Sequence, residues 1–173
     1  MDLNSARIIL AQMQGCFKEL DVPFVNESEM HSYEGFSNAI NFRSWLEKNS
    51  YLAEIIASVY PSHGVIQLTM NYYENTEDFD ESNIRGLFNL LNAINNSNPT
   101  FYWLFCSEAD KLEFRTAYHF WGSRLSERQF ESLLEKFLKQ GPLYYSYFRR
   151  LVGHNNEDPN RLFNEMQAKL KAV

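Results

Sequence analysis

The apolar residues of this chain change their period four times along its length, and this constrains the fold more than any other feature of the sequence. Residues 2–20, residues 84–95 and the stretch after Ser126 space them by three and four, as amphipathic helices do. Residues 38–73 and 101–121 carry the alternation or the β-forming composition of strands. The predicted order is α-βββ-α-ββ-α-α. It makes residues 1–173 a single α+β domain with a twisted antiparallel sheet of about five strands.

Three strands joined by short turns are predicted between residues 38 and 73. The run 51–60 is rich in β-forming residues, and Pro61-Ser62-His63-Gly64 is a strong turn signal after it. The strand that follows, residues 64–73, alternates cleanly between an apolar set (Ile66, Leu68, Met70, Tyr72) and a more polar set (Val65, Gln67, Thr69, Asn71). We expect one face of this strand to be apolar and the other to be wet or covered by something polar. Residues 21–37 are polar and predicted to be irregular.

A second β unit is predicted at 101–106 and 112–121, joined by a five-residue connection. The second of these strands alternates, with Phe114 on its apolar side and His119 on its polar side. The first is aromatic on both faces, which is typical of a central strand.

The last part of the chain is predicted to be helical. Ser126 to Gln129 form a capping box, with Leu125 and Phe130 at the hydrophobic-staple positions. Gly141-Pro142 should interrupt this helix, so that 143–152 continues at a new angle. Asp158-Pro159 should start a final amphipathic helix over 158–171.

Residues 74–83 hold five acidic side chains, Glu74, Glu77, Asp78, Asp80 and Glu81, and no basic one. The segment lacks the central glycine and the closing glutamate of a calcium loop. Acidic residues just before a helix complement its dipole and cap its amide groups, so we interpret the segment as a helix start.

No catalytic, cofactor-binding or metal-ligating residue is predicted, and no cofactor. The seven glycines form no phosphate-binding loop, and the four histidines, His31, His63, His119 and His154, make no zinc-binding pair. A nucleophilic pair of Cys106 with His119 is one possible reading of the sequence, because both belong to one hairpin. Counting back from the turn, however, places Cys106 near Leu112, several residue pairs away from His119. We therefore predict that the protein is not an enzyme.

The formal net charge is −6, which disfavours binding to nucleic acid. Residues 1–110 carry five basic and 15 acidic residues, and residues 111–173 carry 11 basic and seven acidic ones. Either the two parts attract each other or the C-terminal helices have a solvated, mixed-sign surface, and we favour the second interpretation. The two isolated cysteines and the lack of a signal peptide or an 18-residue apolar run predict a cytoplasmic protein without a membrane span.

The 27 aromatic residues, 16% of the chain, have two dense groups, at 101–106 and 143–148. Each group is either core or contact surface, and the sequence leaves both interpretations open. At helical spacing, Tyr144, Tyr147, Phe148 and Leu151 are most simply one buried stripe, with Arg149 and Arg150 in solvent.

Residues 84–151 resemble the YbjN-like family, called bacterial sensory transduction regulators. The segments that carry the resemblance are LFNLLNAINNSNP (87–99), FYWLFC (101–106), LEFRTAYHF (112–120) and LSERQFESLLEKFLKQGPLYYSYFRRL (125–151). The hairpin turn departs from the family because it lacks glycine, and we interpret the helix 158–171 as an appendage. The resemblance implies a fold similar to that of type III secretion chaperones, whose members are often homodimers that bind other proteins. It supplies no catalytic residues.

Our first functional hypothesis is a non-enzymatic regulatory or chaperone-like module that binds a protein partner as a homodimer. An exposed face or edge of the sheet could accept an extended segment of that partner. The alternatives are a dedicated type III secretion chaperone, and a small-ligand-binding protein or enzyme with an unrecognised site. The partner-binding residues and the partner itself are not identified by the sequence.

Overall fold

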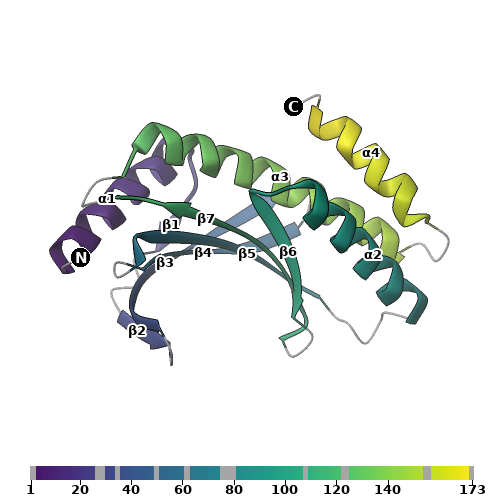
Figure 1. Cartoon of the computed structure of the whole chain (residues 1–173), viewed down its shortest axis with the longest axis horizontal. Coiled ribbons are helices and arrows are strands. Elements are labelled where there is room, and N and C mark those ends of the chain that lie inside the picture. The colour runs from purple at the N-terminus through teal and green to yellow at the C-terminus, as the bar shows by residue number, and fades with distance from the viewer. Residues whose placement is uncertain are drawn as a thin grey trace.

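Four helices and one antiparallel sheet make up the structure (Figure 1). The helices are α1 (Leu3–Glu19), α2 (Glu81–Ser97), α3 (Glu127–Gly153) and α4 (Pro159–Lys171). The strands are β1 (Phe24–Val25), β2 (Met30–Tyr33), β3 (Phe36–Lys48), β4 (Tyr51–Tyr60), β5 (Val65–Tyr73), β6 (Phe101–Cys106) and β7 (Lys111–His119). The α+β class and the five long strands are as predicted, but β1 and β2 lie in the region 21–37 that was expected to be irregular.

This computed structural model describes residues 3–25, 30–33, 36–48, 51–60, 63–74, 81–106, 109–121, 125–153 and 157–171. For residues 3–6, 25, 30–33 and 36–42 it describes the backbone alone. Several sequence predictions therefore fall outside the described residues, namely those on the acidic stretch 75–80, on Pro61 and Ser62, and on His154. The side chain of His31 is likewise outside the description.

The strands are arranged in the order β1-β3-β4-β5-β7-β6, and β2 pairs with β3 beside this path. Every pairing is antiparallel. The prediction that residues 101–106 form a central strand is wrong, because β6 ends the order. Its side chains alternate between buried Phe101 and Trp103 and exposed Tyr102 and Leu104. Apolar residues on both faces of a strand therefore do not require that both faces be covered.

The helices lie on one side of the arched sheet, and the core forms between them and that side (Figure 1). The apolar set predicted for residues 64–73 faces the core as expected, because Ile66, Leu68 and Met70 of β5 are fully buried. In the polar set, Thr69 and Asn71 are buried too, at 8% and 1% exposed. Side chains from α1 and α3, such as Phe17 and Phe137, are fully buried in the same core. Burial of this apolar surface is the main favourable contribution to folding.

Helix α3 runs through Gly141 and Pro142 without a break, so the predicted change of direction there is wrong. Proline removes one backbone hydrogen bond from a helix and crowds the preceding turn. Here the apolar stripe continues on both sides of it, with Phe137 before and Tyr144 after, both buried against the sheet. Gly141 allows the close approach, since a Cβ atom built on it would lie 2.6 Å from Met70 Sδ. Tertiary packing therefore overrides the local helix-breaking signal.

The ends of two helices follow from local chemistry. Helix α1 ends in a Schellman motif, in which the amide of Val22 donates to the carbonyl of Phe17 and the amide of Asp21 to that of Lys18. Asp21 has the left-handed φ of 54° that this motif requires. At the start of α3, Leu125 and Phe130 are both buried, as expected of a hydrophobic staple.

Helix α4 packs outside the sheet-facing layer, against α2 and α3 (Figure 1). Leu162 and Met166 are its fully buried residues. Arg150 of α3 binds Glu157 at 3.1 Å and Glu165 of α4 at 2.9 Å, which fixes the helix from its polar side. No helix in the described part of the chain has the length and apolar character needed to cross a membrane.

Candidate functional site

The side of the sheet that faces away from the helices is the candidate functional surface, and we call it the open face. No helix of the described residues lies over it (Figure 1). The strand register shows which side chains share it, because facing residues of neighbouring strands point to the same side. Its described members include Arg43, Trp45, Leu52, Glu54, Ile56, Thr69, Asn71, Tyr73, Tyr102, Leu104, Lys111, Glu113 and Arg115.

Two rows of residues cross this face from β3 to β6. One row contains, in order, Trp45, Glu54, Asn71, Glu113 and Leu104. The next row contains Arg43, Ile56, Thr69, Arg115 and Tyr102. Adjacent strands lie roughly 4.8 Å apart, so each row is a line of touching side chains. The middle of the two rows is mostly polar, and each row ends on an aromatic or aliphatic side chain at β6. We call its polar members the polar centre: Glu54, Asn71, Thr69, Glu113 and Arg115.

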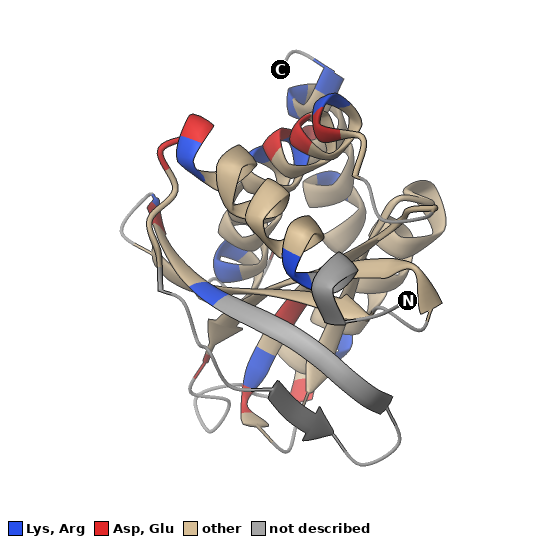
Figure 2. Ribbon diagram, turned by 90° about the vertical axis from the view of Figure 1, so that its left-hand side faces the viewer, with Lys and Arg blue, Asp and Glu red and all other residues tan. Residues whose placement is uncertain are grey.

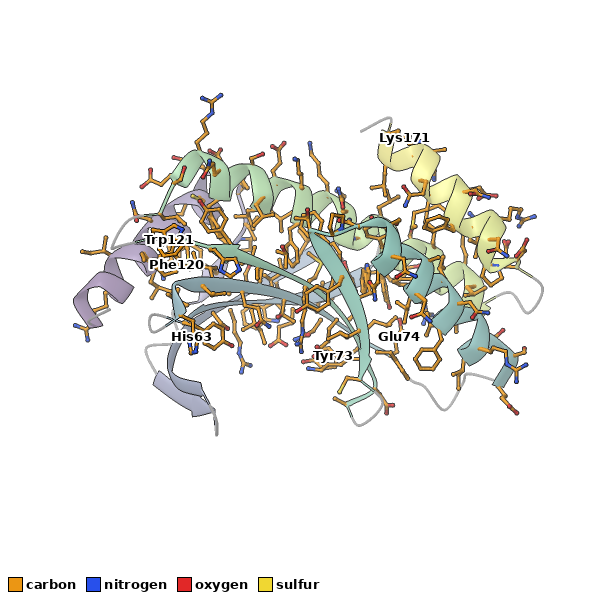
Figure 3. The ribbon with its side chains drawn as sticks, viewed as in Figure 1. His63, Tyr73, Glu74, Phe120, Trp121 and Lys171 are labelled. Carbon is orange, nitrogen blue, oxygen red and sulfur yellow. The ribbon has the colours of Figure 1, made fainter. Side chains whose placement is uncertain are left out.

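Glu54 is the first of two carboxylates in the polar centre, and its side chain is only 12% exposed. It accepts hydrogen bonds from Arg43 at 3.2 Å, from Asn71 Nδ2 at 3.0 Å and from the Tyr73 hydroxyl at 2.8 Å. Burial raises the pKa of Tyr73, and its hydrogen bond to Glu54 raises it further. Figure 3 shows Tyr73 on the side of the sheet away from the helices.

Glu113 is the second carboxylate, and its side chain is 6% exposed. Lys111 Nζ lies 2.7 Å from one of its oxygens, and Arg115 binds the other. The basic groups are more exposed than the carboxylates that they cover, since the side chains of Lys111 and Arg115 are 20% and 30% accessible. A buried carboxylate is stable only when it is paired in this way.

The polar centre also contains one acceptor and one donor without a hydrogen-bond partner among the described residues. Asn71 Oδ1 is the acceptor and Arg115 Nε is the donor, and both atoms are buried. Unpaired buried polar atoms reduce stability by about 1–3 kcal/mol each. Both atoms lie on the face that no described helix covers, so the described residues leave hydrogen bonds unmade in this part of the open face.

Large apolar side chains surround the polar centre. Eight large hydrophobic residues of the described chain are exposed, and five of them lie on the open face: Trp45, Leu52, Tyr73, Tyr102 and Leu104. Their exposed fractions range from 38% for Tyr102 to 62% for Leu52. Scattered single residues of this kind need no explanation, whereas a group of five on one sheet face indicates an interaction surface.

The two dense aromatic segments are now assigned to different places. Residues 143–148 belong to the core, because Tyr144, Tyr145, Tyr147 and Phe148 are all buried. Residues 101–106 contribute Phe101 and Trp103 to the core and Tyr102 to the open face. The polar set of β5 was the only indication of the open face in the sequence. The carboxylates of the open face, Glu54 and Glu113, belong to β4 and β7, and only the strand register places them beside β5.

Arg149 is exposed as predicted, with 43% of its side chain accessible, and it also forms an ion pair with Glu74 at 2.5 Å. Glu74 was predicted to belong to a helix start, but it directly follows β5. The Glu74 side chain is only 3% exposed, and it also accepts a hydrogen bond from Tyr145. Tyr145 stacks on Tyr72 with ring centroids 3.9 Å apart. Glu74 therefore connects the end of β5 to α3 by an ion pair that joins residues 1–110 to residues 111–173.

The histidines and cysteines form no site within the described residues. Cys106 pairs with Lys111 and His119 pairs with Val65, at opposite ends of β7, so the two are far apart as predicted. Cys16 is buried in the core, and burial together with the nearby Glu127 raises its pKa to about 11. No three His, Cys, Asp or Glu side chains of the described chain are close enough to hold a metal ion.

Two surface depressions were considered as ligand sites. One, of about 420 Å³, lies between β6, β7 and α3 and includes Phe101, Tyr118 and Lys136. The other, of about 520 Å³, lies where the start of α2 meets α4 and includes Arg85 and Pro159. None of the groups with a raised pKa described above lines either depression. Most of the residues that line each depression are polar, whereas small-molecule sites are mostly apolar with a few polar groups.

Charges of both signs are interspersed over the molecule (Figure 2). Helix α4 and the end of α3 form a network of Arg150, Arg161, Glu157 and Glu165. This arrangement supports the mixed-sign surface that was favoured for the C-terminal helices.

Comparisons with known proteins add no relatives. A scan of protein-family models, a search of curated proteins and a search of solved structures each found no match to this chain. The resemblance to the YbjN-like family and to type III secretion chaperones therefore remains a prediction from the sequence.

Proposed function

We propose that this chain is a non-enzymatic protein-binding module whose partner docks on the open face. The observation that carries this proposal is the grouping of five exposed large hydrophobic residues on the side of the sheet that no described helix covers. Exposed apolar area of this kind gains free energy when it is removed from water, roughly 25 cal/mol per Å².

The residue types on this face favour a protein as the ligand. Protein interfaces are enriched in tyrosine, tryptophan and arginine, and these residues dominate their binding energy. The open face presents Trp45, Tyr73 and Tyr102 together with Arg43 and Arg115. The two arginines are paired with buried carboxylates, so they offer little net positive charge to a nucleic acid phosphate.

The unpaired atoms of the polar centre support the same proposal. A polypeptide carries both N–H donors and C=O acceptors, which are what Asn71 Oδ1 and Arg115 Nε lack. Both atoms are buried, so neighbouring side chains must move before a partner can reach them. The bound state would then recover the hydrogen bonds that the free protein leaves unmade.

We further propose that the protein acts as a homodimer in a regulatory or chaperone-like role. The sequence resemblance motivates this part of the proposal, and a dedicated secretion chaperone is its narrower form. The mass of the purified protein in solution, measured by light scattering, tests the dimer. The identity of the bound partner separates a regulator from a secretion chaperone.

Site-specific photocrosslinking in cells tests the open face directly. A photoreactive phenylalanine analogue replaces Tyr102 on the open face in one variant and Ile8 of α1 in the other. Ile8 is a matched control because it is an exposed large hydrophobic residue, 51% accessible, that lies on a helix. We expect a protein adduct from position 102 that is absent from position 8.

A further variant tests whether the adduct at position 102 reflects specific binding to the open face. Trp45→Lys places a charge in the apolar part of the open face, and we expect it to abolish the adduct formed at position 102. Equal crosslinking at both positions, or an adduct that survives Trp45→Lys, would contradict the proposal.

A further inference from the structure

Strand β6 is an edge strand with an unusual composition for that position. Its sequence, FYWLFC, has no charged residue and no proline within residues 101–106. Proteins normally protect such edges from pairing with other chains by lysine, proline, a bulge or a covering element. A six-residue segment that is uncharged and rich in β-forming residues is the kind that pairs most readily. Protection of this edge must therefore come from outside the strand.

Asn95 of α2 provides that protection at the centre of the strand. Its Nδ2 donates to the carbonyl oxygen of Trp103 at 2.9 Å, and its Oδ1 accepts from the amide of Trp103 at 2.7 Å. An incoming strand would make the same pair of hydrogen bonds with the N–H and C=O of one edge residue. The Asn95 amide therefore occupies the position of a neighbouring strand.

A second asparagine from the end of the same helix closes the beginning of β6. Asn98 Oδ1 accepts from the amide of Phe101 at 3.2 Å and from that of Thr100 at 3.1 Å. Phe101 and Trp103 are two residues apart, so their amides point to the same side of the strand. Farther along, Phe88 of α2 contacts Phe105 edge to face, with ring centroids 5.8 Å apart. Figure 1 shows α2 beside β6.

We propose that the outer edge of β6 is a strand-addition site held closed by Asn95, and that its occupant when opened is β6 of a second copy of this chain. Two copies of one edge strand pair antiparallel about a two-fold axis, so each presents to the other the edge that it needs. The strand lacks charge, so no like charges oppose this pairing. The pairing would also continue the open face from one copy into the next, through Tyr102 and Leu104.

This inference does not depend on the proposed function. The open face is a side-chain surface, whereas the closed edge is a row of backbone groups held by α2. Position 102 lies on β6, so an adduct with a second copy of this chain supports the edge pairing, whereas an adduct with a different protein supports docking on the open face.

The test is the solution mass of Asn95→Ala, measured by sedimentation over a range of concentrations. Alanine is a good helix former and removes both hydrogen bonds to Trp103. We expect the mass of Asn95→Ala to rise above that of the parent protein as concentration increases, because every chain then carries an edge that can pair. The matched control is Asn92→Ala, an exposed position on the same helix, which should keep the parent mass.

Two further measurements test whether β6 is the pairing surface and whether Asn95 closes its edge in the parent protein. Adding Tyr102→Lys to Asn95→Ala places a charge on the strand and should restore the parent mass. In the parent protein, hydrogen exchange of the Trp103 amide should be slowed as strongly as that of Phe114 in the neighbouring β7. A folded Asn95→Ala at the parent mass, an associated form that persists with Tyr102→Lys, or fast exchange at Trp103 in the parent would each overturn the proposal. The exchange measurement applies even if Asn95→Ala fails to fold.

Discussion

Gly141 lies in the middle of α3, close against Met70 and Phe114 of the sheet, and its replacement by alanine tests how that contact determines the course of the helix. A Cβ atom at this position would lie 2.6 Å from Met70 Sδ and 3.0 Å from Phe114 Cδ1. Both distances are shorter than ordinary van der Waals contact. Something in the core must therefore move when alanine is introduced.

Two opposing effects determine how much Gly141→Ala changes the free energy of unfolding. Alanine in place of glycine inside a helix stabilises it by up to about 1 kcal/mol. Overpacking a core by one methyl group costs about 1–3 kcal/mol when the neighbours cannot yield. Met70 Sδ accepts a hydrogen bond from Tyr72 at 3.0 Å, and Phe114 stacks on Phe137 with centroids 5.0 Å apart. Both neighbours are held in place, so we expect a net loss of about 1–2 kcal/mol.

Urea denaturation measures this change, with Gly15→Ala as the matched control. Gly15 is also inside a helix, but a Cβ atom there would meet nothing within 4 Å. Gly15→Ala should therefore gain up to about 1 kcal/mol, while Gly141→Ala loses stability at an unchanged denaturant slope. If Gly141→Ala is as stable as Gly15→Ala, the close approach of α3 to the sheet is not the reason for a glycine at this position.

Three further predictions concern stability. Asp21→Gly should stabilise the protein by up to about 1 kcal/mol in thermal unfolding, because Asp21 holds a φ of 54° that glycine adopts without strain; an unchanged or lower midpoint would argue against strain there. Glu74→Leu should cost about 3 kcal/mol, since it leaves the Tyr145 hydroxyl and Arg149 without their shared buried partner; a loss no larger than that of an exposed-residue variant such as Glu135→Leu would contradict this. The pKa of Cys16 is raised from 9.0 to about 11 by burial, so its contribution to stability is complete below pH 9 and is lost as the pH rises through about 11. Cys16→Ala should therefore show a smaller loss of stability over that interval than the parent, and an identical pH profile would exclude the effect.

Much of the local structure can be predicted from the sequence, because it depends on neighbours along the chain. The alternation of residues 64–73 determined which side of β5 is buried, and the apolar stripe after Ser126 determined the buried side of α3. Both patterns depend only on the geometry of a single strand or helix. Counting residues back from the turn correctly separated Cys106 from His119, but it placed Cys106 near Leu112, whereas the structure pairs it with Lys111.

Tertiary structure alone decided the features that carry function. Strand order placed β6 at the edge, although its composition is that of a central strand, because order depends on pairings between distant segments. Packing against Met70 and Phe114 carried α3 through Pro142, since the buried surface outweighs one lost hydrogen bond. The polar centre combines Glu54, Asn71 and Glu113 from three strands, so no local spacing could reveal it. The sequence by itself determined which side chains share each face, whereas only the fold determined which face the described helices leave uncovered and which edge is closed.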